Sequence, residues 1–167
     1  MKDYLRLIDT HTRGPRYDVT PLFADAAAFA ALVSDLIAPF DVAEIDFVAG
    51  IDALGFILGT AIAIRLGRGF IPIRKGGKLP VQADAMDFVD YTGQSKSLEL
   101  RAGAVPLGAK ILLVDEWIET GAQVKAAAQL IERQGGVLAG IASISIDLNE
   151  KTRSLLETYH CHSVWVE

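Results

Sequence analysis

The chain has 167 residues, of which 51% are apolar, and a formal net charge of −5. This length suits one domain over 1–167 with a core of its own, and the composition excludes a disordered chain. The negative charge gives no reason to expect nucleic-acid binding. No apolar run reaches the roughly 18 residues that span a bilayer, and the charged first 18 residues lack the apolar core of a signal peptide. The single cysteine, Cys161, cannot form an internal disulfide, so we expect a cytoplasmic protein without a membrane partner.

The first half of the chain predicts a helix and then a strand, a helix and a strand. Apolar residues at helical spacing indicate a helix over 25–37. A short strand follows at 44–50, a helix at 55–67 and a second strand at 70–73. Strands that alternate with helices favour a parallel sheet.

Periodicity fails from Arg74 to about Lys96, where the sequence is rich in glycine and charge. A connection of this length is usually functional or mobile, so we expect a long flexible loop over about 74–97. The elements predicted after it are strands at 96–101 and 110–114, a helix at 121–136, and strands at 137–147 and 162–167. The whole pattern predicts an α/β fold with a mostly parallel central sheet and helices on both faces.

The end of the strand at 110–114 carries the most informative residues. Open parallel sheets bind ligands beyond the carboxyl ends of their strands. Here Asp115 and Glu116 follow the strand, and "ETGAQ" leads into the next helix. Free backbone N–H groups at a helix N-terminus attract an anion, Thr120 can add a hydroxyl, and Gly121 allows close approach.

A ligand that binds here must carry an anionic group for the turn and hydrogen-bond donors for the two adjacent carboxylates. Ribose 5-phosphate has this character, because its phosphate would bind the turn while its vicinal hydroxyls donate hydrogen bonds to the acids. The alternative is that Asp115 and Glu119 only cap the helix.

Three motifs in collinear order resemble the type I phosphoribosyltransferase family. "ILLVDEWIETGA" is similar to that family's signature of an apolar strand, two acids and a small-residue phosphate turn. "FVAGIDALGFILGTAIAIRLG" followed by "FIPIRKGGKLP", and also "RYDVTPLFADAAAF", resemble the adenine phosphoribosyltransferase branch. The resemblance covers about residues 15–146 and implies that family's Rossmann-like fold, in which the long loop acts as a hood that excludes water.

The resemblance implies transfer of the 5-phosphoribosyl group from 5-phosphoribosyl 1-pyrophosphate to a nitrogenous base. Asp115 and Glu116 would hold the ribose hydroxyls. The residues implied for the 5-phosphate are Glu119, Thr120, Gly121, Ala122 and Gln123, and those for pyrophosphate are Ile51, Asp52, Arg74, Lys75 and Lys78. Magnesium (Mg2+) would be held through the substrate, with no metal site made by the protein alone, and family analogy implies a homodimer.

Several positions differ from the pattern of the adenine branch. Ala53 and Leu54 stand where that branch has Ser-Arg, so one cationic contact is absent. Gln123 closes the phosphate turn in place of Thr. Arg16 and Tyr17 stand at the base pocket, near the place of an aromatic residue that stacks on adenine.

Two carboxylates are candidates for the group that exchanges a proton with the base. Asp90 in "FVDYTG" is similar to the hood carboxylate of the adenine branch, whereas Glu119 stands where 6-oxopurine enzymes place an acid. Either could act as a general acid or base, and each could be only a solvated charge.

Two classes of function remain open from the sequence. The first is a purine phosphoribosyltransferase, with adenine as the favoured base. The second is a regulatory protein that binds phosphoribosyl pyrophosphate or a nucleotide without turnover. A dinucleotide-binding domain is disfavoured, because no Gly-x-Gly-x-x-Gly motif opens a helix after the first strand.

Overall fold

The computed structural model describes residues 2–14 and 16–165. Its strands form one seven-stranded sheet in the order β3-β4-β2-β1-β5-β6-β7. The strands are β1 (Phe47–Ile51), β2 (Gly69–Lys75), β3 (Ala83–Val89), β4 (Ser95–Arg101), β5 (Lys110–Ile118), β6 (Val137–Ile146) and β7 (Cys161–Trp165). The five strands β2-β1-β5-β6-β7 pair in parallel, which confirms the mostly parallel sheet. The last two residues of the strand predicted at 162–167 lie outside the described residues.

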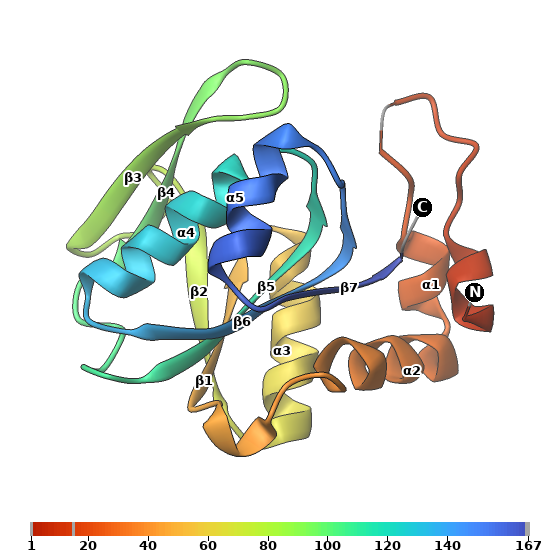
Figure 1. Ribbon diagram of the computed structural model, residues 1–167, viewed down its shortest axis with the longest axis horizontal. Helices are drawn as coiled ribbons and strands as arrows, with labels where there is room; N and C mark the ends of the chain where they lie inside the picture. Colours follow the sequence, from red (N-terminus) through yellow and green to blue (C-terminus); the bar gives the residue numbers. More distant parts are fainter. Residues whose placement is uncertain (1, 15, 166–167) are drawn as a thin grey trace.

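Helices cover both faces of the sheet, as predicted (Figure 1). They are α1 (Thr20–Ala24), α2 (Ala26–Ile37), α3 (Leu54–Leu66), α4 (Ala122–Arg133) and α5 (Glu150–Thr158), with short 3-10 turns at Asp3–Leu7 and Val42–Glu44. None of the helices in the described residues is long and apolar enough to cross a membrane.

Successive residues of the central strands point to opposite faces and so belong to two separate cores. Leu113 packs in the core under α4 and α5, whereas Leu112 and Val114 pack in the core under α1, α2 and α3. All three side chains are fully buried. This two-sided burial explains why β5 reads as a continuous apolar run in the sequence.

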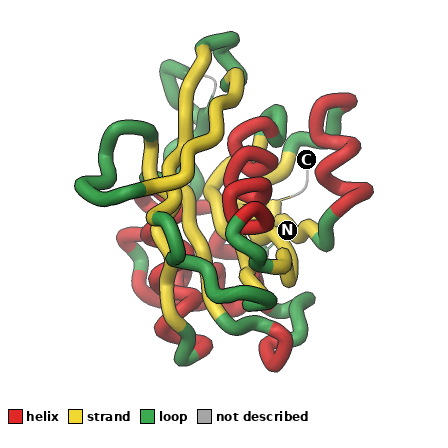
Figure 2. The backbone as a smooth tube through the Cα atoms, turned by 90° about the vertical axis from the view of Figure 1, so that its left-hand side faces the viewer, coloured by secondary structure: helices red, strands yellow, loops and turns green. Residues whose placement is uncertain are grey.

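The segment predicted as a long loop contains a β-hairpin, so that prediction is wrong over 83–89. Strands β3 and β4 pair antiparallel from Ala83 opposite Arg101 to Val89 opposite Ser95, and the hairpin projects beyond the rest of the sheet (Figure 2). The alternation of β3 is hidden because an acid, Asp84, sits on its inner side and receives a hydrogen bond from Gln134 at 2.7 Å.

Two glycines let the turn after β1 approach its neighbours. A Cβ atom on Gly50 would lie 2.3 Å from the backbone oxygen of Gly55, and one on Gly55 would lie 2.7 Å from the backbone oxygen of Val114. Gly50 also pairs with Val114 across the sheet. The turn at 50–55, in which the Asp52–Ala53 peptide is cis, therefore packs directly against the end of β5.

We expect Gly50→Ala to lower the free energy of unfolding by about 1–3 kcal/mol, because the added methyl group meets backbone that cannot move aside. Gly14→Ala is the matched control, since a Cβ atom there meets nothing within 4 Å. Urea denaturation of both variants measures the difference. Equal stability of the two variants would contradict this packing.

Candidate active site

The two acids lie within β5, because the strand continues to Ile118 rather than ending at 114 as predicted. Asp115 pairs with Ser143 in the neighbouring strand β6. The Ser143 hydroxyl donates to the backbone oxygen of Glu116 at 2.8 Å, and the Glu116 amide donates to the Asp115 carboxylate at 2.9 Å. Regular sheet structure therefore holds both acids in place.

Burial makes both acids hard to ionise. Asp115 is 7% exposed, and burial raises its pKa to about 6, although hydrogen bonds from the Glu116 amide and Gln123 act in the opposite direction. Burial, and secondarily the charge of Asp115, raises the pKa of Glu116 to about 7. The site thus holds carboxylates whose charge is easily changed near neutral pH.

The turn after β5 leads into α4 through a glycine. Gly121, at φ 72°, is the N-cap of α4 and leaves the helix without a side-chain cap. The two acids that were the alternative capping groups have other partners: Asp115 receives the Gln123 amide at 3.0 Å, and Glu119 pairs with Arg16. The positive end of the dipole of this twelve-residue helix is therefore not screened by a carboxylate cap, and it favours a negative charge nearby.

A cavity of about 380 Å³ brings together residues from three distant parts of the chain. Arg16 comes from the N-terminal segment, Lys75 and the hairpin residues from the other wall, and the phosphate turn from the floor. The predicted site residues that line it are Arg16, Lys75, Asp90, Asp115, Glu119, Thr120, Gly121 and Gln123.

Other predicted residues are not among the described residues that line this cavity. Tyr17, predicted for the base pocket, packs edge-on against Trp117 with ring centres 5.6 Å apart. The rest are Glu116, Ala122, Ile51, Asp52, Arg74 and Lys78. Arg74 in β2 pairs with Asp52 in the turn after β1 at 3.4 Å. Among the residues predicted to contact pyrophosphate, Lys75 lines the cavity.

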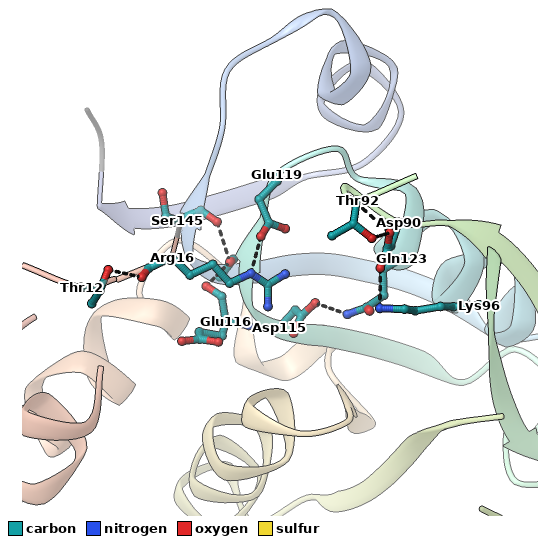
Figure 3. A network of polar contacts seen from close by, with 11 residues as sticks. Thr12, Arg16, Asp90, Thr92, Lys96, Asp115, Glu116, Glu119, Gln123 and Ser145 are labelled. Carbon is teal, nitrogen blue, oxygen red and sulfur yellow. Dashed lines mark hydrogen bonds and ion pairs between the residues drawn. The ribbon is translucent and has the colours of Figure 1, made fainter. Parts of the chain in front are cut away.

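Arg16 connects the turn after β5 to the hairpin, and Figure 3 shows its contact with Glu119. Its Nε donates to Glu119 at 2.5 Å, and its guanidinium lies 4.7 Å from the ring centre of Tyr91. Burial lowers the pKa of Arg16, the bond to Glu119 raises it, and the net direction is upward. A permanent positive charge therefore stands close to the acids.

The two candidates for proton exchange differ in their surroundings. Asp90 forms an ion pair with Lys96, and its Oδ1 accepts from the amides of Thr92 and Gln94 and from the Thr92 hydroxyl. These bonds hold the pKa of Asp90 well below its usual range and fix the turn of the hairpin. Glu119 also lines the cavity and has Arg16 as its side-chain partner. Its side chain is 21% exposed, against 8% for Asp90, so it is the more accessible of the two.

Glu99 was missed by the sequence reasoning. Its carboxylate accepts from three consecutive amides, those of Gly77 at 2.6 Å, Lys78 at 3.2 Å and Leu79 at 3.2 Å. These bonds, led by that of Gly77, lower the pKa of Glu99. It shapes the segment after Lys75, but in the sequence it is one acid in an alternating strand.

A family model described as the phosphoribosyl transferase domain matches residues 20–162. The chain belongs to the phosphoribosyltransferase family.

Named relatives agree with this assignment. An adenine phosphoribosyltransferase of Dinoroseobacter shibae is 44% identical over 94% of this chain and 88% of its own length. The crystal structure of the Rhodothermus marinus adenine phosphoribosyltransferase has a TM-score of 0.88 and 32% identity, covering 96% of this chain and 94% of that one. That of Giardia lamblia, complexed with 9-deazaadenine, has a TM-score of 0.86 and 28% identity, covering 97% and 94%.

No group of three or more His, Cys, Asp or Glu side chains suited to hold a metal ion occurs among residues 2–14 and 16–165. The carboxylates that line the cavity, among the described residues, are those of Asp90, Asp115 and Glu119.

The raised pKa values predict the pH dependence of stability. Between pH of about 4 and about 7 the folded protein keeps protons on Asp115 and Glu116 that the unfolded chain has lost. The contribution of these groups to stability is therefore present below about pH 4 and is lost as pH rises through about 7. Denaturation of the wild type and of Asp115→Asn/Glu116→Gln at several pH values measures this. An unchanged pH slope in the double variant would contradict the assignment.

Proposed function

We propose that this enzyme transfers the 5-phosphoribosyl group from 5-phosphoribosyl 1-pyrophosphate to adenine and releases pyrophosphate. The observation that carries the proposal is the pair of acids at the end of β5, immediately before the uncapped turn of α4. Relatives named adenine phosphoribosyltransferase support the choice of base.

The donor's ribose 5-phosphate fits the floor of the cavity. Its 5-phosphate would accept hydrogen bonds from the backbone of residues 119–123, where the helix dipole favours negative charge. Its 2- and 3-hydroxyls would donate to the ionised carboxylates of Asp115 and Glu116. Gln123 supports this arrangement, because its amide already holds Asp115.

In the reaction, a ring nitrogen of the base bonds to C1 of the ribose as the bond from C1 to the pyrophosphate oxygen breaks. The electron pair leaves with pyrophosphate, and the proton on the base passes to a carboxylate. Glu119 is our choice for that carboxylate, because its side chain in the cavity is 21% exposed, against 8% for Asp90. Lys75 would stabilise the negative charge that builds on the leaving group.

Mg2+ is part of the proposal and would be held mainly by oxygens of the donor. Asp115 and Glu116 supply carboxylate oxygens, the ligand type that this ion prefers, directly or through water. When bound, the ion would neutralise charge on the departing pyrophosphate.

A homodimer and a cytoplasmic location remain predictions. The single cysteine of the chain is consistent with a reducing compartment.

The alternative of a regulatory protein without turnover has one observation in its favour. Arg16 already lies between Glu119 and Tyr91, where a base would need room. Lys75 in the cavity wall favours the enzyme, because a protein that only binds the donor needs no group for a leaving pyrophosphate.

Asp115→Asn combined with Glu116→Gln is expected to abolish donor binding, because the amide groups offer the ribose hydroxyls poorer acceptors than carboxylates do. Calorimetry with 5-phosphoribosyl 1-pyrophosphate and Mg2+ measures it. Glu157→Gln, on the exposed side of α5, is the control and should bind as the wild type does. Unchanged affinity in the double variant would contradict the site.

Glu119→Gln is expected to leave donor binding intact and to slow turnover with adenine by about 10²–10⁴-fold, the range typical of a lost general acid or base. Asp90→Asn should slow turnover less, because the Asp90 carboxylate stays ionised at neutral pH and serves the hairpin turn. Steady-state kinetics of both variants compare the two carboxylates. A larger loss in Asp90→Asn would assign the proton exchange to Asp90.

A further inference from the structure

We propose that Asn149 is a positioning residue for the 5-phosphate of the donor. It holds the peptide between Glu119 and Thr120 in the orientation that turns the Thr120 N–H toward the phosphate. The inference rests on the proposed function and adds to it the N-cap residue of α5, which lies outside the three motifs of the sequence analysis.

Both ends of the Asn149 side chain are used. Its Oδ1 accepts from the amides of Lys151 at 2.9 Å and Thr152 at 3.2 Å, which caps α5. Its Nδ2 donates to the backbone oxygen of Glu119 at 2.8 Å. One side chain thus joins the start of α5 to the first residue of the phosphate turn.

The geometry of a peptide bond makes this contact directional. The one cis bond found among the described residues is Asp52–Ala53, so the bond between Glu119 and Thr120 is trans. In a trans peptide the C=O and the following N–H point in opposite directions. Because Asn149 holds the Glu119 oxygen, the Thr120 N–H points away from Asn149. Both residues of this peptide line the cavity.

This orientation matters for the binding of an anion. With the peptide turned over, a carbonyl oxygen would face the phosphate and repel it, and one N–H donor would be lost. Such a rotation changes ψ of Glu119 and φ of Thr120, which lie before the first residue of α4. The peptide therefore needs a partner that fixes its orientation, and the side-chain amide of Asn149 is that partner.

Two other contacts hold α5 against the same region. Leu155 is fully buried and lies 3.4 Å from the place where a Cβ atom on Gly121 would stand. Lys125 of α4 donates through Nζ to the Lys151 backbone oxygen at 3.0 Å and to the Ser154 hydroxyl at 2.7 Å. Since these contacts do not involve Asn149, α5 should stay in place when the bond to Glu119 is removed.

Substitutions at 149 separate the bond to Glu119 from the helix cap. Serine keeps a capping oxygen but is too short to reach Glu119 and adds no charge. Aspartate has the length of asparagine and also caps, but it places an oxygen where the donor stood. The matched control is Thr152→Val, which removes hydroxyl bonds of the capping box, including that to the Asp147 backbone oxygen at 2.6 Å, and leaves the Asn149 amide in place.

The experiment is calorimetry of ribose 5-phosphate, of the full donor with Mg2+, and of pyrophosphate with Mg2+, together with thermal denaturation and steady-state kinetics. Asn149→Ser should weaken the binding of ribose 5-phosphate and of the donor by about tenfold, because it removes the hydrogen bond that orients the peptide between Glu119 and Thr120. Asn149→Asp should weaken them more, and the affinity for pyrophosphate should not change. The KM for the donor should rise while kcat changes little. Thr152→Val should lower the melting temperature and leave the affinities as they are.

Three outcomes would overturn the inference. One is unchanged affinity for ribose 5-phosphate in both Asn149 variants while the wild type binds. Another is an equal loss of affinity in Thr152→Val, which would reduce Asn149 to a helix cap. Failure of the wild type to bind either ribose 5-phosphate or the donor would overturn the proposed function, and the inference with it.

Discussion

The site depends on a pair of adjacent carboxylates held at the end of a buried strand. A carboxylate removed from water is costly to ionise unless something replaces the water. In this protein Gln123 donates to Asp115, and Arg16 brings a positive charge close to both acids. These contacts replace the lost water only in part, because burial still raises the pKa of both acids. A sugar that donates hydroxyl hydrogen bonds, together with Mg2+, would supply further compensation from the substrate.

The rest of the fold serves to bring groups to that pair. Parallel pairing of β1 with β5 sets the glycine turn beside Asp115, and the close approach is possible because Gly50 and Gly55 lack side chains. The hairpin of β3 and β4 forms the opposite wall and carries Tyr91 to the guanidinium of Arg16. The N-terminal segment, the end of β5 and the hairpin meet at one cavity. Arg16 of the N-terminal segment contacts both Glu119 after β5 and Tyr91 of the hairpin.

Local signals predicted much of this arrangement. These signals are patterns of residues close together in the chain. They are the apolar run of β5, the helical spacing of α2 and α3, and the acids and glycine before α4. Strand β3 was missed because its inner face includes Asp84, whose partner Gln134 is fifty residues away. The contacts of Glu99 and Asn149 were missed for the same reason, since a bond from a side chain to distant backbone leaves no periodic mark. The packing of Tyr17 against Trp117 was not predicted, because orientation in an irregular segment depends on tertiary contacts.

The most direct test of the account is release of pyrophosphate from 5-phosphoribosyl 1-pyrophosphate and Mg2+, with adenine, guanine, hypoxanthine, xanthine, uracil and orotate supplied separately. The account predicts turnover with adenine and much slower turnover with the other five. Tight binding of the donor without pyrophosphate release from any of the six would contradict it and would make the protein a regulatory binder of the donor.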